Sequence, residues 1–388
     1  MLNILFISHD ATRTGAPIAL LHLMRWIKQN TNNRITILLK GGGELEEEFK
    51  SISTTYFWSY QSKVENVWKA RVQRLTKKPT RYRKSIVNSL NSIGFDLIYA
   101  NTVVASDLAA ELKSVLGCPA ICHVHELKIM IDQAVGRNRF IVIANTIDYF
   151  IAASEAVMNN LSSNYAIPLD KIGKVYEFIP TNEITLEKTY ESIKEELSIP
   201  QDAFVVGASG TLDWRKSPDL FVQVAHFTKT FYKKQPYFVW VGGGMPREFV
   251  NLRYDLERVQ LLPYVKFIDS KKNPADYMQI FDVFALTSRE DPYPLVCLEA
   301  ANLAKPILCF NDSGGMPEFV EQDCGFIIPF LRPDLMAERI SYLMDNPQEV
   351  KKLGYVAKQK VSTQHDVGVA GKQIINYINE IVQQEIKQ

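Results

Sequence analysis

Short runs of consecutive apolar residues alternate along the chain with longer segments in which apolar residues recur every three or four positions. A run of four to eight apolar residues is typical of a strand buried on both faces, and the longer spacing is typical of an amphipathic helix. Strands alternating with helices predict parallel sheets of the α/β class. The predicted strands cover residues 3–9, 34–40, 95–102, 120–126, 149–154, 203–209, 237–241, 265–269, 283–288 and 306–310.

The chain opens twice with the same arrangement. In the first half, a strand is followed by the polar loop DATRTGAP, a helix and a second strand that ends before the three glycines 41–43. In the second half, a strand is followed by the loop GTLDWRKSP, a helix and a strand that ends before the glycines 242–244. Two such openings predict two doubly wound, Rossmann-like domains that face a central cleft.

The length of 388 residues also exceeds what one hydrophobic core usually fills. A polar, charged segment lies between Pro180 and Pro200, which is typical of a connector. The predicted domains are therefore residues 1–180 and 202–369, joined by a linker at 181–201. The terminal segment 370–388 has apolar residues at helical spacing, namely Ile374, Ile375, Ile378 and Ile381.

Composition narrows the class of protein. Hydrophobic residues make up 46% and charged residues 22% of the chain, as in a globular enzyme, and the net charge of +1 argues against nucleic acid as a partner. No stretch has the apolar length of a signal segment or a membrane span. The five cysteines lie in apolar runs, which indicates reduced core residues in a cytoplasmic protein.

Cys118, Cys122, His123 and His125 are residue types that can bind a metal. We predict no metal site there, because successive side chains of a strand point to opposite faces.

The stretch TSREDPYPLVCLEAA, residues 287–301, contains a spaced pair of acids. Pro294 suits the first turn of a helix, which places Asp291 just before that helix and Glu299 in its second turn. A carboxylate can accept two hydrogen bonds from a vicinal diol, so paired acids are suited to sugar hydroxyls. The alternative is that Asp291 only caps the helix and Glu299 is solvated.

Two further loops carry residues suited to a phosphorylated ligand. Arg215 and Lys216 precede a helix that begins near Pro218. Two cations there can hold a diphosphate without a metal, unless they are only a solvated pair. Gly314 and Gly315 follow the strand 306–310, and their backbone amides could approach a phosphate or sugar, unless they only form a turn.

Taken in order, these segments resemble retaining glycosyltransferases of family 4, which have the GT-B fold. TSREDPYPLVCLEAA resembles their acid-x7-acid signature, and KPILCF and SGGMPEFVEQDCGFIIP follow it in the family's order. GTLDWRKSP resembles the diphosphate loop, SHDATRTGAP the glycine loop of the first domain and IAASEAVMNNL the end of the first sheet. The resemblance covers nearly the whole chain.

The resemblance implies a role for each matching residue. Glu299 would bind the ribose of a nucleotide sugar, Asp291 the transferred sugar, and Arg215 with Lys216 the diphosphate. The implied catalytic residues are His125, Asp291, Arg215 and Lys216. The implied donor-binding residues are Gly15, Arg215, Lys216, Glu290, Asp291, Tyr293, Leu295, Glu299, Gly314, Gly315 and Met316.

The chain also departs from the family pattern. Thr211 stands where an arginine is common, so that Lys216 would depend on Arg215. Asp291 replaces the usual glutamate, and Glu290 could substitute for it. Pro292 and Pro294 lack the backbone amides that glycines would offer. The choice between His123 and His125 is left open, because both lie on the same face of one strand.

The implied reaction moves a sugar from a UDP- or GDP-sugar to a saccharide hydroxyl, with retention at the anomeric carbon and without a metal or other cofactor. The terminal segment 370–388 is expected to pack on the first domain. Residues 63–87 contain nine Lys or Arg and one acid, with Trp68 and Tyr82 between them. Such a segment suits an anionic membrane surface and a lipid-linked acceptor. The protein would then be peripheral on the inner face of the plasma membrane. The alternative is that this segment is a solvated helix.

Three other activities are alternatives to this reaction. A nicotinamide-dependent dehydrogenase is disfavoured because neither opening loop contains G-x-G-x-x-G. An epimerase of the same fold would need more acid-base residues around the sugar than the motifs supply. A protein that binds nucleotide sugars or glycans without turnover stays open, because of Thr211 and the prolines after Asp291.

Overall fold

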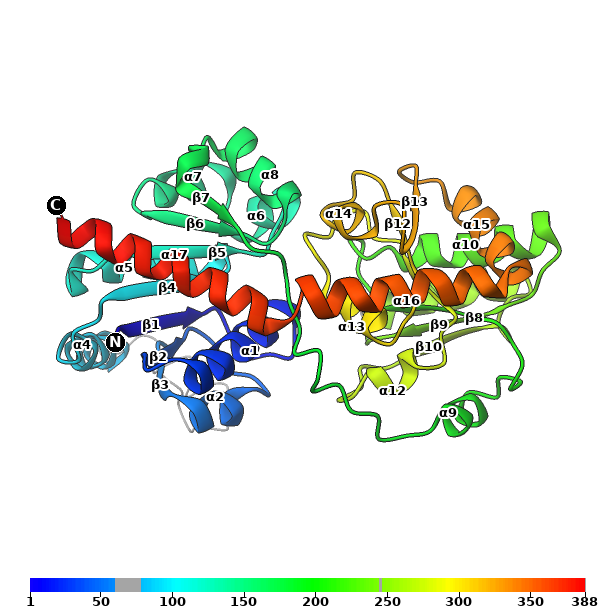
Figure 1. Ribbon diagram of the computed structural model, residues 1–388, viewed down its shortest axis with the longest axis horizontal. Helices are drawn as coiled ribbons and strands as arrows, with labels where there is room; N and C mark the ends of the chain where they lie inside the picture. The colour runs from blue at the N-terminus through cyan, green and yellow to red at the C-terminus, as the bar shows by residue number, and fades with distance from the viewer. Residues whose placement is uncertain (60–77, 244–245, 388) are drawn as a thin grey trace. The chain divides into compact units, whose positions relative to one another are not determined.

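The computed structural model describes residues 1–59, 78–243 and 246–387 (Figure 1). Its internal contacts divide the chain into two units. Unit 1 comprises Met1–Tyr176 and Val367–Gln388, and unit 2 comprises Glu177–Asp366. Each unit is built around its own parallel sheet.

Unit 1 contains a seven-stranded sheet in the order β3-β2-β1-β4-β5-β6-β7. Its strands are β1 (Asn3–Ser8), β2 (Arg34–Leu39), β3 (Thr54–Phe57), β4 (Leu97–Asn101), β5 (Ala120–Val124), β6 (Tyr149–Ala152) and β7 (Ile172–Lys174). Its helices are α1 (Gly15–Asn30), α2 (Glu46–Ile52), α4 (Lys78–Asn91), α5 (Val103–Leu116), α6 (Lys128–Ala134), α7 (Arg137–Ala144), α8 (Glu155–Tyr165), the short η1 (Leu169–Lys171) and α17 (Val367–Lys387).

Unit 2 contains a six-stranded sheet in the order β10-β9-β8-β11-β12-β13. Its strands are β8 (Val205–Ser209), β9 (Tyr237–Val241), β10 (Val265–Ile268), β11 (Val283–Leu286), β12 (Ile307–Phe310) and β13 (Gly325–Ile328). Its helices are α9 (Tyr190–Glu196), α10 (Pro218–Tyr232), α11 (Pro246–Arg258), α12 (Ala275–Met278), α13 (Leu295–Asn302), α14 (Met316–Val320), α15 (Pro333–Asp345) and α16 (Pro347–Gln364).

The prediction of two Rossmann-like parallel sheets is confirmed. The central strands β1, β4, β8 and β11 are buried along almost their whole length, which is why they appear in the sequence as unbroken apolar runs. The edge strands β3, β7 and β13 were not predicted. They have three or four residues each, and β3 is only partly buried, so its sequence lacks an apolar run.

The C-terminal helix α17 belongs to unit 1, although the chain reaches it from unit 2. Figure 1 shows α17, drawn in red, alongside α1. A Cβ atom on Gly371 would lie 2.4 Å from the indole ring of Trp26, so only glycine permits this close approach of α17 to α1. The ring of Tyr377 packs against that of Tyr149, and Ile374 and Ile378 are fully buried.

The unit boundaries differ from the predicted ones around residues 181–201. This segment, expected to be a linker, is part of unit 2 and contains α9. The ammonium of Lys194 is buried and donates to the carbonyls of Gln201 and Ala203 at 2.8 and 2.9 Å. The carboxylate of Asp276 accepts hydrogen bonds from the amides of Glu187 and Lys188. Charged residues thus fix this segment to the second sheet's helices.

Most of the basic segment 63–87 lies outside the described residues. Its last ten residues, 78–87, belong to α4, where the Arg83 guanidinium lies 5.0 Å from the ring centre of Trp58. None of the helices in the described part of the chain combines the length and apolar character needed to cross a membrane.

Candidate functional site

The predicted cation loop and the acid-x7-acid segment leave neighbouring strands of the second sheet. β8 and β11 are paired, and they continue at their carboxyl ends into residues 210–217 and 287–294. From β8 the chain continues to β9 on one side of this pair, and from β11 it continues to β12 on the other side. Such a switch point is where open parallel sheets bind ligands. The structure therefore places both motifs at the expected edge of the sheet.

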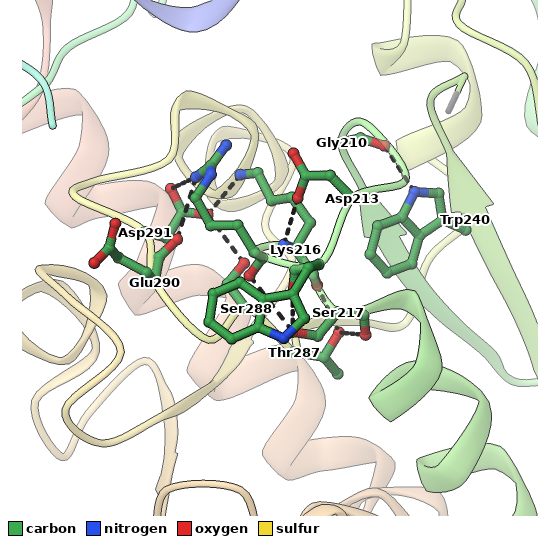
Figure 2. A network of polar contacts seen from close by, with 11 residues as sticks. Gly210, Asp213, Lys216, Ser217, Trp240, Thr287, Ser288, Glu290 and Asp291 are labelled. Atoms are coloured by element: carbon green, nitrogen blue, oxygen red, sulfur yellow. Dashed lines mark hydrogen bonds and ion pairs between the residues drawn. The ribbon is translucent and has the colours of Figure 1, made fainter. Parts of the chain in front are cut away.

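The cation loop is held by its own short contacts. The Asp213 carboxylate accepts a hydrogen bond from the Lys216 amide at 2.8 Å, and the Trp240 indole donates to the Gly210 carbonyl at 2.8 Å (Figure 2). Gly210 has a φ of 145°, and a Cβ atom there would meet the Lys216 side chain at 3.3 Å. Glycine at this position therefore leaves room for the lysine stem.

Both predicted cations contact the first predicted acid. The Lys216 ammonium lies 2.5 Å from Oδ2 of Asp291, and the Arg215 guanidinium lies 3.5 Å from Oδ1 (Figure 2). The Ser288 hydroxyl donates to Oδ2 at 3.0 Å. Asp291 is only 4% exposed, and burial raises the pKa of its carboxyl, but the charges of Lys216 and Arg215 outweigh burial and hold that pKa below its usual value.

These contacts exclude two of the simpler alternatives. Asp291 does not cap α13, because the helix begins at Leu295 with Pro294 as its N-cap residue. Arg215 and Lys216 are not a solvated pair, because their side chains are 23% and 11% exposed and both face Asp291. Lone pairs on Oδ1 of Asp291 stay available for a further donor, since a carboxylate offers about four acceptor positions.

The second predicted acid has a different environment. Glu299 lies in the second turn of α13 and is half-buried. Its carboxyl has no hydrogen-bond or ion-pair partner within residues 1–59, 78–243 and 246–387, and burial raises its pKa to about 7. A half-buried carboxyl without a protein partner can accept hydrogen bonds from a ligand's hydroxyl groups.

The glycine segment after β12 is paired with the acid loop. The Asp291 amide donates to the Ser313 carbonyl at 2.7 Å, and the Gly315 amide donates to the Pro292 carbonyl at 2.9 Å. The Gly315 amide is thus used inside the protein. The amides of Gly314 and Met316 have no hydrogen-bond partner in the described part of the chain, so these two can still meet a ligand.

Three other predicted donor residues surround Asp291. Figure 2 shows the carboxylate of Glu290 directed away from Lys216, while its carbonyl accepts from Arg215 at 3.2 Å. Tyr293 points into unit 2, where its hydroxyl lies 3.2 Å from Nε2 of His365. Burial lowers the pKa of His365 to about 4. Leu295 is the buried first residue of α13.

The two remaining predicted residues lie in unit 1. Gly15 is the exposed first residue of α1, and His125 follows the end of β5. Nε2 of His125 lies 2.9 Å from Oδ1 of Asn101, and the Asn101 amide donates to the Ala16 carbonyl. His123 is instead a core residue that is 1% exposed, and its Nδ1 lies 2.7 Å from the Tyr99 hydroxyl. Of the two histidines, His125 is the more accessible.

The cysteines are buried free thiols. Burial raises the pKa of Cys118 to about 11 and that of Cys122 well above its usual value. In the part of the chain that the structure describes, no three His, Cys, Asp or Glu side chains are grouped so that they could hold a metal ion.

Sequence reasoning missed several residues that shape the site, namely Asp213, Ser288 and Arg289. All three lie inside the quoted motifs, but nothing in a linear pattern indicates their partners. The contacts of Arg289 connect residues about 70 positions apart in the chain.

Comparisons with known proteins agree with this geometry. Residues 189–360 match the model of the family described as glycosyl transferases group 1. This part of the chain is therefore similar to group 1 glycosyltransferases. The O-antigen biosynthesis glycosyltransferase WclY of Escherichia coli is 27% identical over 194 residues, which cover 49% of this chain and 52% of WclY. The amylovoran biosynthesis glycosyltransferase AmsD of Erwinia amylovora is 22% identical over 54% of this chain and 58% of AmsD. The chain thus spans about half the length of these curated relatives.

Solved structures show the fold of the whole chain. HepE of Anabaena, in complex with UDP-glucose, has a TM-score of 0.82 at 21% identity and covers 98% of this chain and 100% of its own. WaaG, a glycosyltransferase involved in lipopolysaccharide biosynthesis, has a TM-score of 0.71 at 11% identity, covering 97% and 99%. The chain therefore has the GT-B fold, as predicted.

Proposed function

We propose that this protein is a retaining, metal-independent glycosyltransferase. It transfers a sugar from a nucleotide diphosphate sugar to a hydroxyl of a saccharide acceptor. The observation that carries the proposal is the cluster of Arg215, Lys216 and Asp291 at the switch point of the unit 2 sheet, followed in α13 by Glu299, whose carboxyl has no partner among the described residues. Two cations, one ionised acid and one acid with a raised pKa match the diphosphate, the sugar and the ribose of such a donor.

Each part of the donor has a matching group. Arg215 and Lys216 supply charge-assisted hydrogen bonds to the diphosphate, each worth about 1.5–3 kcal/mol. The Glu299 carboxylate accepts from the ribose hydroxyls. Oδ1 of Asp291 accepts from the transferred sugar, and the amides of Gly314 and Met316 donate to phosphate or sugar oxygens. UDP is the first nucleotide to test, because HepE was solved with UDP-glucose.

In the proposed reaction, the bond between the anomeric carbon and the β-phosphate oxygen breaks, and its electron pair stays on the phosphate. The acceptor oxygen forms its bond to the anomeric carbon on the same face. The acceptor's proton passes to the leaving phosphate oxygen. Arg215 and Lys216 stabilise the charge that grows on this phosphate, and we expect electrostatic stabilisation to be the largest catalytic contribution. No protein nucleophile is required.

The acceptor belongs to a class that the relatives suggest. WclY and AmsD are named for the biosynthesis of O-antigen and amylovoran. We therefore propose a saccharide acceptor in the synthesis of a bacterial surface polysaccharide. A lipid-linked acceptor, reached by a cytoplasmic enzyme that binds an anionic membrane through residues 63–87, stays a prediction. Cosedimentation with vesicles of phosphatidylglycerol, compared with vesicles of phosphatidylcholine, would test it.

Calorimetric titration with UDP and GDP in EDTA tests the donor site. The wild type is expected to bind one of the two nucleotides without metal, and both Glu299→Ala and Lys216→Ala are expected to weaken that binding. Binding of neither nucleotide, or binding that both substitutions leave unchanged, would contradict the assignment.

Turnover separates an enzyme from a binding protein. Release of free nucleotide from the matching nucleotide sugar, in the presence of saccharide acceptors, is the expected result. Tight donor binding without turnover on any acceptor would instead favour a protein that binds nucleotide sugars without transferring them.

A further inference from the structure

The backbone of the cation loop is held by the segment that follows β11. Four successive carbonyl groups, those of Trp214, Arg215, Lys216 and Ser217, accept hydrogen bonds from this segment. The Arg289 amide donates to the Arg215 carbonyl at 2.7 Å. The Thr287 hydroxyl lies 3.3 and 3.1 Å from the carbonyls of Lys216 and Ser217.

The side chain of Arg289 completes this set. Its guanidinium donates to the Trp214 carbonyl at 3.2 Å and to the Ser217 hydroxyl at 2.9 Å. It also binds the Asp219 carboxylate through two nitrogens, at 2.9 and 2.7 Å. Only 17% of the Arg289 side chain is exposed, and its guanidinium lies 5.4 Å from the ring centre of Trp214. A planar guanidinium can make these bonds at once, whereas an ammonium cannot.

The loop needs such support because its backbone is strained. Ser217 has φ 58° and ψ 57°, a left-handed conformation that costs a residue other than glycine about 1 kcal/mol or more. Ser217 is also the N-cap residue of α10, and Asp219 lies in the first turn of that helix. Arg289 therefore connects the loop, the start of α10 and the exit of β11 at one point.

We infer that Arg289 is a positioning residue of the donor site. Its guanidinium holds the Trp214 carbonyl and the Ser217 hydroxyl, and so keeps the loop in the conformation in which the Arg215 and Lys216 side chains reach Asp291, where the diphosphate would bind. Arg289 thus contributes to diphosphate affinity without contacting the ligand. The inference rests on the proposed function, because the diphosphate is the ligand whose binding it sets.

The test compares ligands with and without a diphosphate. Binding of UDP and uridine, and of GDP and guanosine, is measured by calorimetry for the wild type, Arg289→Gln and Arg289→Lys. We expect both variants to bind the diphosphate about tenfold or more weakly, as for the loss of about one charge-assisted hydrogen bond. Nucleoside affinity is expected to stay within about twofold, because the proposed donor site holds the ribose through Glu299 and not through the cation loop.

Arg289→Lys separates positioning from charge. Lysine keeps the positive charge but loses the fork that holds Asp219 and the two loop oxygens. Wild-type diphosphate affinity in Arg289→Lys would show that only the charge matters and would overturn the inference. An equal loss of nucleoside and diphosphate affinity would overturn it too, because the substitution would then weaken the whole nucleotide site and not diphosphate binding in particular.

Two further variants keep the test decisive if the Arg289 variants fail to fold. Asp219→Asn removes the anchor of the guanidinium while leaving Arg289 in place, and we expect a smaller loss of diphosphate affinity in the same direction. Arg332→Gln is the matched control, because Arg332 forms a comparable two-nitrogen pair with Asp334 away from the loop. It is expected to bind like the wild type. If the wild type itself binds neither diphosphate, the proposed function fails; if it binds one and the Arg289 variants match it, only the role of Arg289 fails.

Discussion

The two units share one sheet order but present different chemistry at the same place. β1 lies between β2 and β4 in unit 1 just as β8 lies between β9 and β11 in unit 2. The strand ends of unit 2 carry two cations and an ionised acid. Those of unit 1 carry a mixed set, in which burial lowers the pKa of His9 beside Asp10, and Lys40 is paired with Asp107. Topology thus decides where a site forms, and the loop residues decide what it can bind.

Their backbones also differ in strain. In unit 1, Thr102 follows β4 with a φ of 83°, which is rare for a β-branched residue. Its hydroxyl lies 3.3 Å from Nδ1 of His9, and its amide donates to the His123 carbonyl. In unit 2, Ser217 in the cation loop is one of the residues with a positive φ. Strain of this kind is concentrated at functional sites, which supports a role for both strand ends.

The largest effect is expected from a substitution that removes a charge from the Arg215, Lys216 and Asp291 cluster of unit 2. We expect Lys216→Ala to weaken UDP binding about 100-fold or more and to abolish turnover, because the diphosphate loses its buried cation. The same change leaves Asp291 incompletely paired and lowers the free energy of unfolding by up to about 3 kcal/mol. Calorimetry and urea denaturation measure the two effects.

The double variant Lys216→Ala with Asp291→Ala serves as the control. It removes both charges, so we expect stability to recover while UDP binding stays lost. Recovery of binding in the double variant would mean that the lysine only neutralises Asp291 and does not hold the diphosphate.

The next effect tests the contribution of unit 1. We expect His125→Ala to lower turnover by about 100-fold while UDP affinity stays within about twofold, because the resemblance assigns this residue to the reacting sugar and not to the nucleotide. Initial rates and calorimetry measure both quantities. His22→Gln, on α1, is the control and is expected to keep wild-type turnover. Equal losses in His125→Ala and His22→Gln would remove His125 from the site.

A smaller effect concerns the pH dependence of the two acids in unit 2. The pKa of Glu299 is raised to about 7, so its ionised form, which we propose accepts the ribose hydroxyls, is lost as the pH falls through 7. UDP binding should therefore weaken from pH 8 to pH 6. Glu299→Gln should bind UDP about tenfold more weakly at pH 8. Its UDP affinity should also change less between pH 8 and pH 6 than that of the wild type. The titration of UDP itself affects both proteins equally, so the difference between them reports on Glu299.

Stability should change in the opposite direction. A carboxyl with a raised folded pKa destabilises the folded state as the pH rises above its unfolded pKa, because it must ionise while buried. We expect Glu299→Gln to be more stable than the wild type at pH 8, by on the order of 1–3 kcal/mol, and equally stable at pH 4. Lower stability at pH 8 would show that the carboxylate has a structural partner.

The smallest expected effect concerns the strain in unit 1. Thr102→Gly should raise the free energy of unfolding by about 1 kcal/mol relative to Thr102→Ala. Both variants lose the contact to His9, and only glycine relieves the positive φ. Thermal denaturation measures the difference. Equal stability of the two variants would mean that this backbone conformation costs little.

Much of the architecture could be predicted because its signals are local. Unbroken apolar runs marked the central strands, and the loops DATRTGAP and GTLDWRKSP marked their carboxyl ends. The edge strand β3 escaped prediction because it is short and only partly buried. The segment 181–201 resembled a linker because it is polar, yet the amides of Glu187 and Lys188 bind it to Asp276 in α12 of unit 2.

The candidate site could likewise be predicted only in part. Arg215, Lys216, Asp291 and Glu299 were candidates from sequence, because their residue types and spacing match the ligand's chemistry. Their roles stay predictions. The partners of Tyr293 and Arg289 were beyond reach, because His365 and Asp219 are about 70 positions away in the chain and no periodicity connects them.

The sequence by itself determined the two parallel sheets, the strand ends at which polar residues gather and the type of ligand that those residues suit. Apolar periodicity and glycine-containing loops act over a few residues, so they are visible in one dimension. Only the tertiary structure decided that Asp291 is ionised between two cations, that Glu299 has a raised pKa and that the Gly315 amide is already used. Burial and electrostatic interactions depend on distances through space, and the chain sets these distances only when it folds.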